Sequence, residues 1–193
     1  MGVAEPCDKK GYVGGSMNIA FDLDGVLIDI FHVLRLAVME ETGKDIGDID
    51  NCATYSFANL HNTELDKCLA KTYPYFRDFE PVKGAYRLLK AVPKPVYIVT
   101  ARLSKYATDT CLAFEHHFRG IPYRIAFTNG HENKEVFLNG YDYFVEDRGE
   151  TALYLAEKGV TVFLLDKKYN KGFKHNRIKR VKSLGEILKA VVR

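Results

Sequence analysis

Two aspartates stand one residue apart in FDLDGVLID, residues 21–29, where a short apolar run ends and Gly25 follows. A carboxylate can attack phosphorus as a nucleophile, and a neighbouring carboxylate can act first as acid and then as base. Asp22 and Asp24 are therefore candidates for these two roles in phosphate-ester cleavage. The pair alone is weak evidence, because aspartates also cap helices at such positions.

Residues suited to phosphate or metal binding recur where later apolar runs end. They are Thr100, Ala101 and Arg102, then Thr128 and Asn129, then Glu146 and Asp147. Magnesium commonly takes one or two carboxylates together with phosphate and water, so Asp22 and an acid from 146–147 would supply its ligands. Lys134, together with Thr100 and Arg102, would complete a cradle of phosphate donors.

Short apolar strands alternate with helices from residue 81 onward, and an earlier strand carries the two aspartates. The expected strands are 17–24, 94–102, 123–129, 141–149 and 160–166. The expected helices are 29–43, 62–73, 83–92, 105–118, 150–159 and 183–192, and 134–140 is expected to be a short helix or a turn. Continuous apolar strands are typical of a parallel sheet with helices on both faces. We expect an α/β fold with a doubly wound parallel sheet, whose ligands bind beyond the carboxyl ends of its strands.

Residues 29–80 do not fit this alternation, and the part after residue 43 is rich in aromatics. We interpret 29–80 as a small helical cap inserted over the carboxyl edge of the sheet. The core would then consist of 17–28 and 81–193. Residues 1–16, which end in Gly-Gly-Ser, are expected to be a disordered leader or tag outside the fold.

The composition suits one compact domain of 193 residues with a mildly basic net charge of +3. No apolar run reaches the roughly 18–20 residues of a membrane helix, so no membrane partner is expected. The basic run 167–182 is interpreted as a solvated surface, with phosphate attraction as the alternative. The four cysteines lack metal-site spacing, which indicates free thiols and a cytoplasmic location.

Four short motifs resemble, in order, the four signatures of the haloacid dehalogenase superfamily. They are DLDGV, VTAR, a lysine after the third strand, and VEDR, and the resemblance spans about residues 17–190. Within that superfamily the chain is similar to the 5′(3′)-deoxyribonucleotidase family, also called 5′-nucleotidase, deoxy, cytosolic type C. The stretch PVKGA at 81–85 and the ending DKKYN followed by RVKSLGEIL support this second resemblance.

The resemblance implies a role for each matching residue. It implies Asp22 as nucleophile and Asp24 as general acid–base, phosphate binding by Thr100, Ala101, Arg102 and Lys134, and magnesium binding by Asp22, Asp24 through its backbone carbonyl, and Asp147 with Glu146 beside it. Dehalogenases of the superfamily lack the second aspartate, so Asp24 favours a phosphatase. The family's aromatic position near the base carries Ile30 here. Phe31, Tyr55 and Phe57 are the candidate base contacts.

The resulting hypothesis is a magnesium-dependent 5′-nucleotidase that cleaves (deoxy)nucleoside monophosphates through an aspartyl-phosphate. Its expected partner is a small phosphomonoester, and a homodimer is left open. The first alternative is a different phosphatase on the same core, either a nucleic-acid end phosphatase or another small-molecule phosphatase. In a nucleic-acid end phosphatase, the basic run would follow the nucleic-acid backbone. A non-catalytic module that binds phosphorylated ligands is the second alternative, which the intact Asp22 and Asp24 disfavour.

Overall fold

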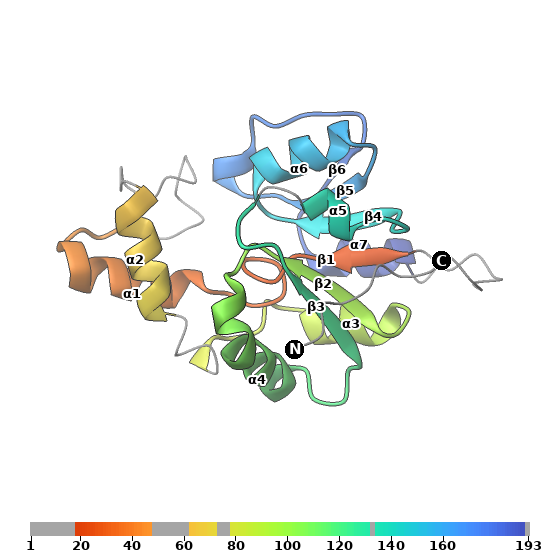
Figure 1. The fold of residues 1–193 in the computed structure, drawn as a ribbon. Helices are drawn as coiled ribbons and strands as arrows, with labels where there is room; N and C mark the ends of the chain where they lie inside the picture. The colour runs from red at the N-terminus through yellow and green to blue at the C-terminus, as the bar shows by residue number, and fades with distance from the viewer. Residues whose placement is uncertain (1–17, 48–61, 73–77, 132–133, 192–193) are drawn as a thin grey trace.

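Six parallel strands form the centre of the molecule in a computed structural model that describes residues 18–47, 62–72, 78–131 and 134–191 (Figure 1). Their order across the sheet is β3-β2-β1-β4-β5-β6. The strands are β1 (Ile19–Phe21), β2 (Val96–Thr100), β3 (Tyr123–Phe127), β4 (Tyr143–Glu146), β5 (Thr161–Leu165) and β6 (Ile178–Val181). The order reverses beside β1, which pairs with both β2 and β4, and this reversal is where such sheets bind ligands.

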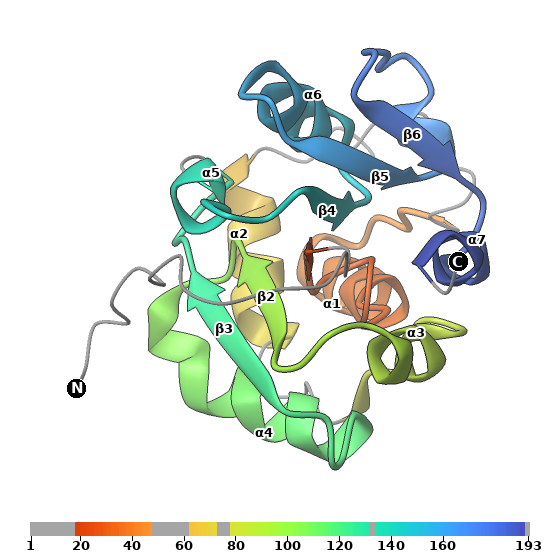
Figure 2. The same cartoon turned by 90° about the vertical axis from the view of Figure 1, so that its right-hand side faces the viewer.

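Helices cover both faces of the sheet, as the doubly wound prediction requires (Figure 2). On one face lie α3 (Ala85–Ala91), α4 (Ala107–His117) and α7 (Leu184–Val191), and on the other lie α5 (Lys134–Phe137) and α6 (Gly149–Glu157). Two separate apolar cores result: Leu88, Phe114 and Ile187 belong to the first, and Leu138 and Leu155 to the second. The predicted α/β fold class is therefore confirmed.

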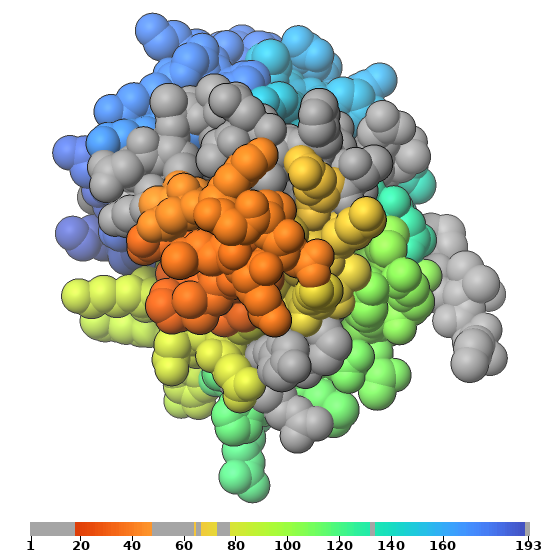
Figure 3. All heavy atoms as spheres, turned by 90° about the vertical axis from the view of Figure 1, so that its left-hand side faces the viewer, coloured from red at the N-terminus to blue at the C-terminus, as the bar shows by residue number. Residues whose placement is uncertain are grey.

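Two further helices lie side by side beyond the carboxyl end of β1 (Figure 1). They are α1 (Phe31–Thr42) and α2 (Asn62–Thr72). The Asp29 carboxylate accepts a hydrogen bond of 3.0 Å from the Phe31 amide where α1 begins, and Gly43, with φ 67°, ends the helix. In the space-filling view, α1 and α2 cover the middle of this side of the molecule (Figure 3).

The sixth strand lies inside the basic run 167–182, where no strand is expected from the sequence. β6 has only four residues, IKRV, and its charged side chains mask the apolar pattern by which a strand is recognised. The Lys179 amino group lies 5.2 Å from the Tyr143 ring centroid, so its stem covers apolar surface at the edge of the sheet. The run is thus partly structural, and its remaining lysines stay interpreted as solvated.

None of the helices in the described ranges has both the length and the apolar character needed to cross a bilayer. Residues 1–16, predicted to be a leader, lie outside the described residues.

Candidate active site

A cavity of about 500 Å³ opens at the carboxyl edge of the sheet, below α2. Asp22, Asp24, Ala101, Arg102 and Glu146 line its inner part. These residues come from segments up to 124 positions apart, and the parallel strands bring them together. The fold therefore brings the strand-end residues together at one edge of the sheet, as predicted.

Lys134, at the start of α5, is fully buried and lies between Asp22 and Glu146. Its ammonium group lies 3.1 Å from Asp22 Oδ1 and 3.0 Å from Glu146 Oε2. Burial alone would lower the pKa of Lys134, but the two carboxylates raise it above its usual range, so the group stays charged. Lys134 thus offsets the repulsion that would otherwise separate Asp22 from Glu146.

Glu146 is also held from the backbone side. Its Oε1 accepts hydrogen bonds of 3.1 Å from the amides of both Asp147 and Arg148, while Oε2 accepts from Lys134. Burial would raise the pKa of Glu146, but Lys134 and the backbone amide of Arg148 lower it below its usual value. Glu146 is therefore a fixed anion that orients the end of β4.

Three buried carboxylates could hold a divalent cation. Asp22, Glu146 and Asp147 each place an oxygen within 4.8 Å of the others. Burial, followed by the charge of Glu146, raises the pKa of Asp22 well above its usual value and that of Asp147 to about 8. A cation among these oxygens would relieve the crowding, and an all-oxygen donor set is the one Mg²⁺ prefers.

Gly25 gives the carboxylate of Asp147 the room it needs. The glycine has φ 75°, and a Cβ atom there would lie 2.2 Å from Asp147 Oδ2. The absence of a side chain after Asp24 therefore lets the Asp147 carboxylate lie against this turn. The three carboxylate donors fit a magnesium ion.

Arg102 contacts Asp24 rather than pointing freely into the cavity. Its Nε and Nη2 donate to Asp24 Oδ2 and Oδ1 at 2.8 Å and 2.5 Å, and its Nη1 donates to the Thr110 hydroxyl at 3.0 Å. This two-pronged contact orients the Asp24 carboxylate and offsets its charge. The predicted role of Arg102 in phosphate binding stays a prediction, and the structure adds a second role beside Asp24.

Thr100 ends β2 and is fully buried, and its hydroxyl accepts a hydrogen bond of 3.3 Å from the Arg102 amide. Ala101, the next residue, lines the cavity. Phe31, a candidate base contact, is buried with its ring centroid 6.4 Å from that of Tyr169, while its neighbour Ile30 lines the cavity. Tyr55 and Phe57, the other candidates, lie outside the described residues.

Several cavity residues escaped the sequence analysis as site residues. They are Lys67 of α2, Lys105 and Tyr106 of the 3-10 helix η3 (Ser104–Tyr106), His131 after β3 and Arg148 after β4. Arg148 ends the VEDR motif, which was a signal for it, whereas the other four are unremarkable in sequence and only the fold assigns them to the cavity. Burial, with the charges of Arg148 and Lys134, lowers the pKa of His131 to about 3, so its ring is neutral.

Tyr169 also escaped, although it stands in the quoted stretch DKKYN. It lies in the 3-10 helix η4 (Lys168–Asn170), and its hydroxyl donates to Asp147 Oδ2 at 2.6 Å. The resemblance of DKKYN to the family's ending was the available signal.

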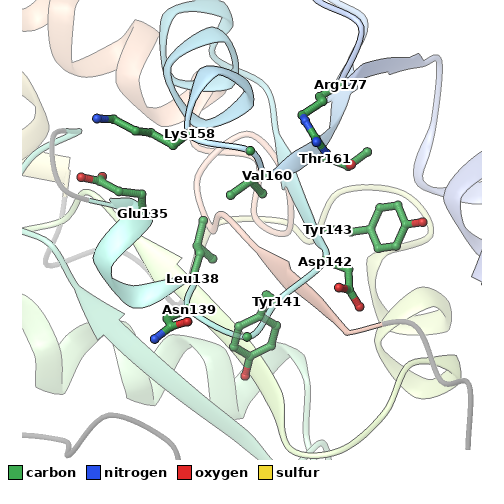
Figure 4. Close-up of a pocket in the computed structure, with 12 residues that line it drawn as sticks. Glu135, Leu138, Asn139, Tyr141, Asp142, Tyr143, Lys158, Val160, Thr161 and Arg177 are labelled. Carbon is green, nitrogen blue, oxygen red and sulfur yellow. The ribbon is translucent and has the colours of Figure 1, made fainter. Parts of the chain in front are cut away.

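A second hollow, of about 930 Å³, lies at the opposite edge, around the amino ends of β4 and β5 (Figure 4). Asp142, Lys158 and Arg177 border it, and all three are exposed. Since water already surrounds these charges, this hollow lacks the packed ionic contacts of the carboxyl edge.

Solved structures share this fold. A haloacid dehalogenase-like hydrolase from Streptococcus pneumoniae matches with a TM-score of 0.61 at 16% identity, covering 91% of this chain and 98% of its own. A hydrolase of the same superfamily from Deinococcus radiodurans, solved with phosphate and sodium, matches with a TM-score of 0.58 at 14% identity, covering 90% of this chain and 94% of its own. Identities this low show the fold alone. No curated protein sequence matches the chain.

The family comparison goes further than the fold. The profile of the family described as 5′ nucleotidase, deoxy (pyrimidine), cytosolic type C protein matches residues 16–193. That span includes both aspartates of FDLDGVLID and every strand of the sheet. The resemblance seen in the sequence is therefore confirmed: the chain belongs to the cytosolic type C 5′-nucleotidase family of the haloacid dehalogenase superfamily and is a phosphoric monoester hydrolase.

Proposed function

We propose that the protein is a magnesium-dependent 5′-nucleotidase that dephosphorylates (deoxy)nucleoside monophosphates. The observation that carries this proposal is the buried contact of Lys134 with Asp22 and Glu146, at the base of a cavity that Asp24 also lines. Burying such a cluster is unfavourable for folding and is typical of catalytic sites.

The proposed reaction has two halves. An Asp22 oxygen attacks phosphorus and forms an aspartyl-phosphate, while the bond from phosphorus to the leaving oxygen breaks and Asp24 gives that oxygen a proton. Water then attacks the phosphorus and passes a proton to Asp24, which releases Asp22 and inorganic phosphate. Asp22, Asp147 and the Asp24 backbone carbonyl, with Glu146 beside them, would hold a magnesium ion, which would neutralise charge on the phosphoryl group.

Charge balance supports an outer ring of cations for the substrate. Lys134 and Arg102 already contact carboxylates, so they only partly compensate an incoming phosphate. Lys67, Lys105 and Arg148 line the same cavity and add positive charge at its rim. We propose that these three residues attract the phosphate, and that Thr100, the Ala101 backbone, Arg102 and Lys134 bind it.

The cavity walls support a nucleoside as the leaving group. Tyr106 offers an aromatic surface, and Leu69 and Ala70 of α2 offer apolar surface in a cavity of about 500 Å³, a size typical of small-molecule sites. In this proposal residues 29–80 form a cap over a core of 17–28 and 81–193. Cys68 and Cys111 are free thiols, which supports a cytoplasmic location. The homodimer stays a prediction.

A phosphate-release screen tests the proposal. Purified protein would be assayed on ribo- and deoxyribonucleoside monophosphates, sugar phosphates and a 3′-phosphorylated oligonucleotide, each with Mg²⁺ and with EDTA. We expect the highest kcat/KM on a nucleoside 5′-monophosphate and loss of release in EDTA. Preference for the oligonucleotide would favour the end phosphatase, and release from none of the substrates would favour the binding module.

A further inference from the structure

A tyrosine that follows β5 at the carboxyl edge of the sheet contacts one of the candidate metal ligands. Tyr169 lies in η4, in the connection between β5 and β6, and its side chain is buried. Its hydroxyl donates a hydrogen bond of 2.6 Å to Asp147 Oδ2. One oxygen of this carboxylate is therefore engaged by the protein, and the other can serve a cation.

The segment that carries Tyr169 is tied firmly to the strands beside the site. The buried Asn170 amide donates hydrogen bonds of 2.7 Å to the carbonyls of both Asp147 and Leu165. Its Oδ1 accepts from the Lys167 amide at 3.1 Å and from Arg180 Nη2 at 2.6 Å. Asn170 thus connects η4 to the ends of β4 and β5, and this fixes the place of the neighbouring hydroxyl.

Asp147 is confined on its other side as well. The missing side chain of Gly25 leaves space that Asp147 Oδ2 occupies, since a Cβ atom there would lie 2.2 Å away. The Tyr169 ring packs at a centroid distance of 6.4 Å from Phe31, which is buried at the start of α1. The Asp147 carboxylate therefore lies between Gly25 and Tyr169, and the hydrogen bond from the Tyr169 hydroxyl fixes the rotation of the carboxylate about its side-chain bond.

We propose that Tyr169 is a positioning residue that holds the Asp147 carboxylate ready for the metal ion. This inference rests on the proposed metal-dependent function and adds a residue to it. Hydrogen-bonding partners of metal ligands typically change metal affinity by about 10–100-fold when they are removed. Loss of the hydroxyl should therefore weaken metal binding and leave the chemistry of Asp22 and Asp24 intact.

Tyr169→Phe removes the hydroxyl and keeps the ring that packs against Phe31. Its matched control is Tyr123→Phe, which also removes a hydroxyl bound to a carboxylate, that of Glu115 at 2.9 Å, at the start of β3 and far from the site. Titration calorimetry of the substrate-free proteins with Mg²⁺ and with Mn²⁺ gives the Kd directly. We expect Tyr169→Phe to raise the Kd about 10-fold and Tyr123→Phe to leave it unchanged.

Enzyme activity at varied Mg²⁺ concentration gives a second readout, which separates weaker metal binding from a general loss of the active structure. The Mg²⁺ concentration for half-maximal activity should rise in Tyr169→Phe, while kcat at saturating Mg²⁺ returns close to the wild-type value. Arg180→Lys provides a variant that keeps the hydroxyl and loosens Asn170, and it should raise the Kd by a smaller factor. It carries the test if Tyr169→Phe does not fold.

The outcomes distinguish a failure of the Tyr169 role from a failure of the metal-dependent function. If the wild-type protein binds metal and Tyr169→Phe binds it with the same Kd, the role of Tyr169 is overturned and the proposed function stands. An unchanged Kd in Arg180→Lys, with Tyr169→Phe unfolded, has the same consequence. If the wild-type protein binds neither ion, the metal-dependent function fails and the role of Tyr169 fails with it.

Discussion

The two ends of the sheet both carry acids and bases around a hollow, but they treat these charges in opposite ways. At the carboxyl edge, Asp22, Lys134 and Glu146 are buried and contact one another. At the amino edge, Asp142 and Lys158 are exposed to water. The amino-edge hollow is the larger, at about 930 Å³ against about 500 Å³, so size does not identify the site.

What separates the two ends is the free energy of burying charge. A charged group leaves water at a penalty of several kcal/mol, and packed apolar residues would often be at least as stable in its place. A buried cluster is therefore better explained by chemistry than by stability, whereas exposed charges at the amino edge need no such explanation. The comparison predicts that equivalent substitutions at the two edges have unequal effects.

The largest difference is expected between Asp22→Asn and Asp142→Asn. Both replace a carboxylate by an amide of nearly equal volume. Asp22→Asn should lower kcat by about 10³-fold or more, because it removes the proposed nucleophile, and Asp142→Asn should leave kcat unchanged. Phosphate release under saturating substrate measures both, with circular dichroism as the check on folding. Turnover close to wild type in folded Asp22→Asn would contradict the mechanism.

Lys134→Met and Lys158→Met compare a buried amino group with an exposed one. Lys134→Met leaves Asp22 and Glu146 without their shared cation, so we expect a loss of about 3–5 kcal/mol in unfolding free energy. Lys158 lies 5.6 Å from the Tyr154 ring centroid at the surface, and its replacement should change stability by about 0.5 kcal/mol. Urea unfolding in EDTA measures both. Equal losses of unfolding free energy in the two variants would show that the contacts of Lys134 with Asp22 and Glu146 stabilise the fold no more than an exposed contact does.

Much of the carboxyl edge was predictable, because its residues follow apolar strands. Asp22, Thr100 and Asp147 each stand at or just after the end of a strand, and parallel strands bring such ends together. Lys134 begins a helix of only four residues, and its position in the site was inferred from its charge and from the family resemblance rather than from periodicity. The fold class followed from the alternation of strands and helices.

The site residues that were not predicted share a different property. Whether they reach the cavity depends on how the segments between the strands are placed in space. Lys67 and Lys105 reach the cavity because α2 and η3 lie over it, which local sequence does not encode. The contact of Arg102 with Asp24 joins residues 78 positions apart, and the polar motif alone fits phosphate binding equally well. β6 was missed because charge patterning hid a four-residue strand.

Gly25→Ala and Gly140→Ala compare the two edges through backbone geometry. Both glycines have positive φ, 75° and 92°, so alanine is strained at either position by about 1–2 kcal/mol. Only at Gly25 would the new Cβ also meet the Asp147 carboxylate, whereas Gly140 faces open space. Gly25→Ala should therefore lower the midpoint of thermal unfolding further and also weaken Mg²⁺ binding. The same loss in both variants would show that the space beside Asp147 is unimportant.

His131→Gln gives the smallest expected effect and tests burial at the carboxyl edge through pH. The pKa of His131 is lowered to about 3 in the folded protein by burial and by the charges of Arg148 and Lys134, against an ordinary value of 6.5. Between these values the unfolded chain binds a proton that the folded chain does not, so the free energy of unfolding falls as the pH falls below about 6.5. Glutamine cannot titrate, and the variant should lose about 1–2 kcal/mol less unfolding free energy than the wild type between pH 7.5 and pH 5.

Urea unfolding of both proteins at the two pH values measures this difference, with pH 7.5 as the reference at which the histidine is neutral in both states. Equal losses in the two proteins would show that the partly buried His131 ring takes up its proton in the folded site as readily as in water.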